Sequence, residues 1–252
     1  MTRGKPTSGY DVREASDTGD TDGLQISLEH GVISQEAAQQ AVMAEWKELT
    51  RCYSEAGPAM GFAGGAVTLR FFVDGHGAIT DVRIVESRVG NFEVERCLVG
   101  VGRKVRFPQP KGNALAQVDY TLEFRSTGAV AVLDLALDEL SAELPALWAR
   151  LAGACEGGLG ADEVAATFYV DAAGAVRSVG LASAASLDES AGRCVSDSIR
   201  RWNVRLAAVQ GGVGRVTIPL RNGDLVAHRD GAEARRYSRT TAGRARRDRP
   251  RR

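Results

Sequence analysis

The residues that could take part in chemistry are few, and they are scattered along the chain of 252 residues. The histidines are His30, His76 and His228, and none has a neighbouring nucleophile or carboxylate pair that would make it a catalytic base. Glu93 and Glu95 flank an expected helix start, where carboxylates complement the helix dipole. The phosphate-binding patterns GxGxxG and GxxxxGKS/T do not occur. We therefore expect no enzymatic activity, no cofactor and no small-molecule substrate.

An internal repeat is the best-defined pattern in the sequence. The segment Val67–Gly77 returns as Val164–Gly174, at a constant offset of 97 residues. The same offset relates Cys97 to Cys194, without a gap in between. Such self-similarity indicates one supersecondary unit used twice.

The four cysteines fall two to a copy, Cys52 with Cys97 and Cys155 with Cys194, at separations of 45 and 39 residues. Closely spaced ligand pairs such as CxxC are absent, so we expect no metal site. The thiols could be free and buried as small hydrophobic groups. Alternatively, each copy could hold one disulfide. The recurrence of both positions in both copies favours disulfides.

Hydrophobic periodicity predicts the elements of the first copy. Ser34 is the expected N-cap of a helix whose apolar residues recur at helical spacing, and alternating apolar residues then predict strands. Asp74 and its counterpart Asp171 are expected to cap tight turns, and Asn91 to cap a second helix. The expected order is helix, strand, strand, helix, strand, at residues 34–53, 67–73, 78–87, 91–105 and 117–125.

The second copy repeats this order in a more degenerate form. Its helices are expected at 140–155 and 187–202, and its strands at 164–170, 175–181 and 216–220. Pro145 requires the first of these helices to begin or kink there. The predicted fold is α+β: two units, at 33–126 and 133–223, each a three-stranded antiparallel sheet with two helices on one face.

The ends of the chain have a different composition. Residues 1–32 are predicted to be a disordered leader, and residues 228–252 a disordered tail with ten arginines and three acidic residues. A tail of this kind could bind a polyanion in the cytoplasm, with contacts from Arg244, Arg246, Arg247 and Arg249. Nucleic acid is not the expected partner, because Tyr237 is the tail's only aromatic residue.

Several motifs of the first unit together match a known family. They are the helix leading to Arg51-Cys52-Tyr53, the strand and turn Gly65–Gly77, the second cysteine in Val94–Cys97, and the helix stop Val105–Pro110. On these motifs the unit resembles the C-terminal domain of the TonB family, specifically its myxobacterial AgmX/PglI branch. The second unit is similar only through the internal repeat.

This resemblance implies a periplasmic interaction module that receives a partner peptide as an added strand. It also implies a place in a transport or gliding-motility complex of the cell envelope. We expect the last strand of the first unit to accept that peptide, at Val118, Tyr120, Leu122 and Phe124. The two units could instead pack as a pseudo-dimer and cover their own sheet edges.

The expected compartment also depends on what the chain lacks. No signal peptide and no run of about 20 apolar residues is visible. Either the chain is cytoplasmic, or it lacks the N-terminus of a longer exported protein. Membrane association is expected only through an upstream segment or another subunit.

Overall fold

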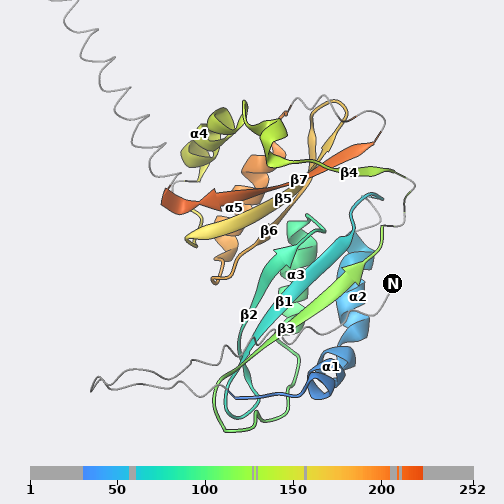
Figure 1. Cartoon of the computed structure of the whole chain (residues 1–252), viewed down its shortest axis with the longest axis vertical. Coiled ribbons are helices and arrows are strands. Elements are labelled where there is room, and N and C mark those ends of the chain that lie inside the picture. The colour runs from blue at the N-terminus through green and yellow to red at the C-terminus, as the bar shows by residue number, and fades with distance from the viewer. Residues whose placement is uncertain are drawn as a thin grey trace, which may run out of the picture.

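The structure is a computed structural model that describes residues 31–56, 61–126, 128, 130–155, 158–204, 209 and 212–223. The predicted tail, with its four candidate arginines, and nearly all of the predicted leader lie outside these residues. The described part is α+β, as predicted, and each half of it has a sheet and a core of its own (Figure 1).

Unit 1, residues 31–126, carries a three-stranded antiparallel sheet in the order β2-β1-β3. Its elements are α1 (Gln35–Ala44), α2 (Trp46–Ala56), β1 (Gly65–Val73), β2 (Ile79–Ser87), α3 (Phe92–Gly102) and β3 (Ala116–Phe124). The predicted caps are present. Ser34 Oγ accepts the Ala37 N–H at 3.3 Å, and Asn91 Oδ1 accepts the Val94 N–H at 3.0 Å.

Two helix boundaries differ from the prediction. The expected single helix at 34–53 is two helices, because Glu45 leaves helical geometry at φ −95° and ψ 10°. The second helix ends at Gly102, since the Lys104 and Val105 N–H groups turn back to carbonyls three residues earlier. Val105 is still buried, so its place in the apolar pattern reflects core packing without helix.

Unit 2, residues 130–223, has a four-stranded mixed sheet in the order β4-β7-β5-β6. Its elements are β4 (Val132–Asp134), η2 (Leu137–Leu140), α4 (Leu144–Ala154), β5 (Glu163–Asp171), β6 (Val176–Ala182), α5 (Glu189–Arg200) and β7 (Val213–Arg221). The prediction of three antiparallel strands was wrong for this unit. The added strand β4 runs parallel to β7 and is only three residues long, too short for alternation to reveal it.

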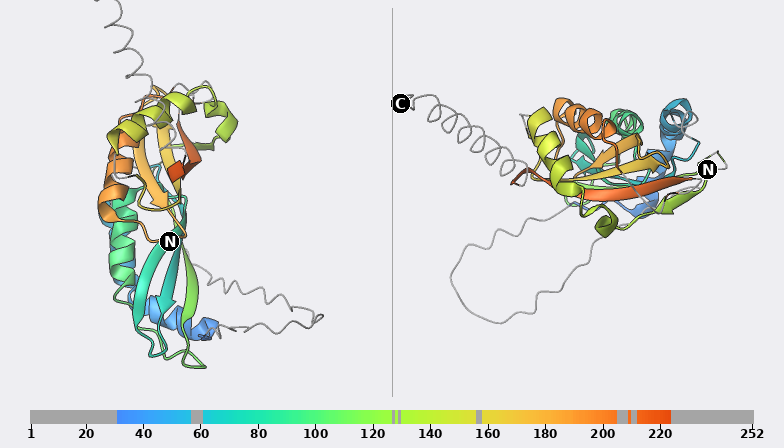
Figure 2. Two further views of the ribbon diagram at one scale, coloured as in Figure 1. Left: turned by 90° about the vertical axis from the view of Figure 1, so that its left-hand side faces the viewer. Right: turned by 90° about the horizontal axis from the view of Figure 1, so that it is seen from above.

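The remaining strands of unit 2 follow the repeat, because the order β6-β5-β7 corresponds to β2-β1-β3. Pro145 lies in the first turn of α4, where its missing N–H costs no hydrogen bond. Figure 2 shows α2, α3, α4 and α5 on the same side of the two sheets. The two cores therefore lie between that helical layer and the inner faces of the sheets.

Candidate interaction site

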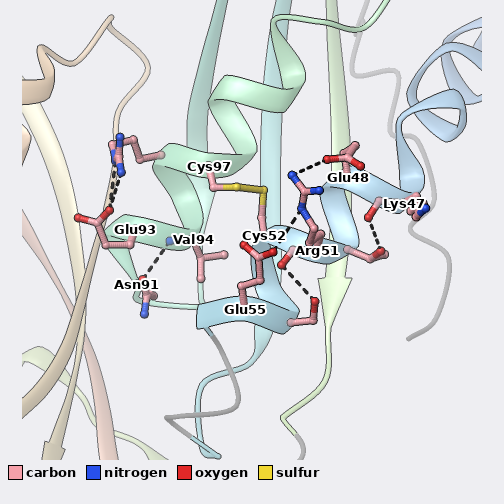
Figure 3. Close-up of a disulfide and its surroundings, with 12 residues drawn as sticks. Lys47, Glu48, Arg51, Cys52, Glu55, Asn91, Glu93, Val94 and Cys97 are labelled. Carbon is pink, nitrogen blue, oxygen red and sulfur yellow. Dashed lines mark hydrogen bonds and ion pairs between the residues drawn. A yellow bond between two sulfur atoms is a disulfide. The ribbon is translucent and has the colours of Figure 1, made fainter.

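Each unit contains one disulfide, as the repeated cysteines predicted. Cys52 on α2 bonds to Cys97 on α3, and Cys155 after α4 bonds to Cys194 on α5. The Cα atoms are 5.6 and 5.9 Å apart, within the usual range for disulfides. Figure 3 shows the first bond tying the two helices of unit 1 together. Two such bonds suggest an oxidising compartment.

The two turn aspartates cap their turns, as predicted. Asp74 Oδ1 accepts the N–H groups of His76 and Ala78, and these hydrogen bonds hold the pKa of Asp74 below its ordinary value. Asp171 accepts two N–H groups of its own turn in the same way. No group of three potential metal ligands occurs within the described part of the chain.

Strand β3 lies at the outer edge of the sheet of unit 1, with β1 on its inner side. Backbone polar groups of successive residues in an antiparallel strand point to opposite neighbours. The Arg88 N–H donates to Ala66 O at 2.8 Å, so even-numbered residues of β1 face β2 and odd-numbered ones face β3. In the uninterrupted β1–β3 register, Leu69 lies opposite Tyr120. The even-numbered residues of β3 therefore direct their polar groups to β1.

The four residues predicted for this edge consequently serve the fold. Tyr120, Leu122 and Phe124 are buried in the core of unit 1, and Val118 packs partly against it. The backbone groups that point away from the sheet belong instead to the alternate residues. These are Gln117, Asp119, Thr121 and Glu123. Among the residues that the structure describes, no strand pairs with this side of β3.

The outer edge of β6, by contrast, is covered by unit 1. The Ser183 N–H, just past β6, donates to Ile84 O of β2 at 2.7 Å. The Leu181 N–H donates to Glu95 Oε2 of α3 at 2.6 Å. The pseudo-dimer alternative is thus realised in part: the two units use β2 and β6 against each other.

Glu95 is the central polar residue of this junction and is 2% exposed. The Ser87 hydroxyl donates to Glu95 Oε1 at 2.5 Å. Burial raises the pKa of Glu95 to about 8, although the hydrogen bonds from Ser87 and Leu181 act in the opposite direction. Gly180 leaves room for the carboxylate, because a Cβ there would meet it and would lie 2.7 Å from the Asn91 nitrogen.

Charged side chains surround Glu95 at the surface of the junction. On α3 and α5, Glu93 and Glu189 each pair with both Arg96 and Arg193, at 2.8–3.4 Å. Arg96 and Arg193 are equivalent in the repeat, so the network links corresponding positions of the two units. A cavity of about 250 Å³ lies beside Glu95 and is also lined by Arg83 and Arg96.

The outer edge of β7, the counterpart of β3, is covered by β4. The Leu135 N–H donates to Arg215 O at 2.8 Å, and Asp134 pairs with the Arg215 guanidinium at 2.6 Å. Arg88 of unit 1 pairs with the same carboxylate at 2.7 Å. Hydrogen bonding from Arg215 is the main reason why the pKa of Asp134 is low. Asp134 therefore fastens β4 to both units.

The sequence did not predict either of the residues that help to cover sheet edges, Glu95 at β6 and Asp134 at β7. In the sequence, a place in the first turn of a helix is enough to account for Glu95. Its position beside Val94 and Leu98 on the apolar face of that helix is the one signal of its burial. Asp134 lies at the start of the second predicted unit, before its first expected helix, where the sequence shows no periodic pattern. Nothing in the described helices is long and apolar enough to cross a membrane.

Comparison with known proteins adds no assignment. No family model, no curated protein and no solved structure matches the chain. The resemblance to the TonB family therefore stays a prediction.

Proposed function

We propose that this chain is a non-enzymatic interaction module of the bacterial cell envelope, of the TonB/AgmX type. It binds an extended partner peptide by strand addition, as part of a transport or gliding-motility complex in the periplasm. The observation that carries this proposal is the outer edge of β3, nine residues long and without a partner strand in the described residues. Edges of this kind are templates for an added strand.

The other edges support the choice of β3. The edge of β6 is covered through Glu95 and Ile84, and that of β7 through β4. The outer side of β4 offers only three residues. A partner that adds to β3 would bond to Gln117, Asp119, Thr121 and Glu123, while the core beneath stays undisturbed.

The two disulfides support a periplasmic compartment. Structural disulfides persist in the periplasm and are rare in the cytoplasm of most bacteria. The alternative function, cytoplasmic polyanion binding by the arginine-rich tail, fits this less well. Its residues also lie outside the described part of the chain.

The proposal is tested with peptides selected against the full chain from a random display library. Hydrogen exchange should show protection of the Gln117, Asp119, Thr121 and Glu123 amides on binding. Glu123→Pro removes one outward N–H and should weaken binding about tenfold, while Glu123→Thr, which keeps the N–H, should not. Peptides that protect amides elsewhere, or that bind Glu123→Pro normally, would contradict strand addition at β3.

A further inference from the structure

We propose that the end of unit 1 opposite the unit junction docks on the surface of an anionic lipid bilayer. This surface, called here the basic tip, consists of the segment between α3 and β3 together with Val32. Its exposed charged and large apolar residues are Lys104, Arg106, Lys111, Leu115 and Val32. Arg103, at the start of the segment, is also exposed but lines the cavity at the unit junction. Figure 1 shows the loops at this end of the sheet, away from unit 2.

The tip has positive charge that is not neutralised locally. Lys104, Arg106 and Lys111 are all exposed, and within the described residues none of the three makes an ion pair. No aspartate or glutamate occurs between Glu95 and Asp119. The tip therefore takes three cations from a stretch without acidic residues.

Acidic residues of neighbouring elements reduce this surplus only in part. Asp74 belongs to the β1–β2 turn, and its carboxylate already accepts N–H groups of that turn. Asp81 at the start of β2 is paired with Arg83 at 2.7 Å. Glu36, in the first turn of α1, is exposed. Asp74 and Glu36 together balance two of the three cations.

Two apolar side chains lie among these charges. Leu115 is 64% exposed and Val32 is 62% exposed, the highest values among the exposed large hydrophobic residues of the described chain. The Gly31 N–H donates to Leu115 O at 2.8 Å, and Val32 exchanges two backbone hydrogen bonds with Lys111 at 3.1 and 3.0 Å. Backbone pairing thus holds both apolar groups beside a lysine.

The tip is already ordered before it meets a partner. Phe107 is buried and packs edge-on against Phe71, with ring centroids 5.2 Å apart. Pro110 is buried too, and its carbonyl accepts the Asn113 N–H at 3.2 Å. Docking therefore requires little ordering of this loop.

A lipid surface suits this combination better than a soluble polyanion does. Lysine and arginine bind anionic headgroups while their neighbouring apolar side chains enter the acyl boundary. A soluble acidic polymer would pair with the same cations but would bury neither Val32 nor Leu115. The apolar pair thus distinguishes the two partners.

The experiment measures binding of the full chain to vesicles of phosphatidylcholine with phosphatidylglycerol, and to phosphatidylcholine alone. Every protein in the comparison carries Arg244→Gln, Arg246→Gln, Arg247→Gln and Arg249→Gln, which lower the contribution of the tail equally. The tip variant is Lys104→Gln/Arg106→Gln/Lys111→Gln. The matched control is Arg150→Gln/Arg200→Gln/Arg201→Gln, which replaces three exposed arginines of unit 2 that form no ion pair with any described residue.

The tip variant should bind anionic vesicles about 100-fold more weakly, from about fivefold for each charge. The control should bind nearly as the parent does, and Val32→Ser/Leu115→Ser should lose about tenfold. Equal losses for the tip and control variants would overturn the proposal, as would equal binding to vesicles without phosphatidylglycerol. So would tight binding to soluble polyglutamate with no effect of the apolar pair, an outcome that assigns the tip to soluble polyanions.

Discussion

Replacing Glu95 by glutamine should remove a large part of the pH dependence of this protein's stability. Burial at the unit junction raises the pKa of Glu95 to about 8, against an ordinary value of 4.5. The difference between these two values corresponds to about 5 kcal/mol, the cost of ionising the buried carboxyl. Glutamine keeps the shape of the side chain, can accept the Leu181 N–H and cannot ionise.

The sign follows from which state binds the proton more tightly. The folded protein binds it more tightly, so the contribution of Glu95 to the free energy of unfolding is highest below pH 4.5. This contribution falls by about 1.4 kcal/mol per pH unit between pH 4.5 and about 8. Above that range the carboxyl is ionised in both states, and the contribution stays constant. The low-pKa carboxylates, such as Asp134, act in the opposite direction at lower pH.

Urea unfolding at pH 5, 6, 7 and 8 measures this effect for the parent and for Glu95→Gln. The difference in unfolding free energy between the two proteins should change by about 4 kcal/mol over that range, in favour of the variant at high pH. Glu123→Gln, at an exposed position, is the matched control and should follow the parent. Parallel pH profiles of parent and Glu95→Gln would refute the assignment of Glu95 as a buried, protonated group.

Three further predictions concern packing, crosslinking and β4. Gly180→Ala should destabilise the protein by more than about 2 kcal/mol in urea unfolding, because the new Cβ meets the Glu95 carboxylate. Gly100→Ala in α3 is the matched control. A Cβ there meets nothing within 4 Å, so this change should stabilise the protein by about 0.5–1 kcal/mol. Removing either disulfide should cost about 4 kcal/mol, for loops of 45 and 39 residues; a thiol assay on denatured protein isolated from its native cells without reductant should find no free cysteine. Asp134→Ala should cost no more than about 1 kcal/mol at neutral pH, since the side chain is 59% exposed. The effect should vanish as the pH falls below the lowered pKa of that carboxyl, and hydrogen exchange at the Leu135 amide should become faster; an unchanged Leu135 amide would exclude Asp134 as the anchor of β4.

Features decided by neighbours in the sequence could be predicted. Asn91 caps a helix through an N–H three residues away, Asp74 caps a turn within four residues, and Pro145 starts a helix by its own geometry. The pairing of the cysteines followed from the repeat, which reports three-dimensional equivalence directly. These signals were enough for the α+β class and for the order of most elements.

Features decided by distant partners could not be predicted. Glu95 receives the N–H of Leu181, 86 residues away, and nothing near either residue announces the contact. Strand β4 owes its conformation to β7 and to two arginines, one in each unit. The edge strand itself was identified, but choosing the residues with outward backbone groups requires the β1–β3 register. The alternation of apolar residues along β3 identifies only the face that packs on the core, so it points to Tyr120 and Leu122.

The covering of edges has a consequence for assembly. A duplicated module with open edges on both copies could pair head to tail without end, as heterologous contacts that do not close build filaments. Glu95 and Ile84 cover one edge and β4 covers another, so that among the described strands the outer side of β3 is the long uncovered edge. If the β3 edges of two chains pair with each other, both edges are used, and the product is a closed dimer instead of a filament.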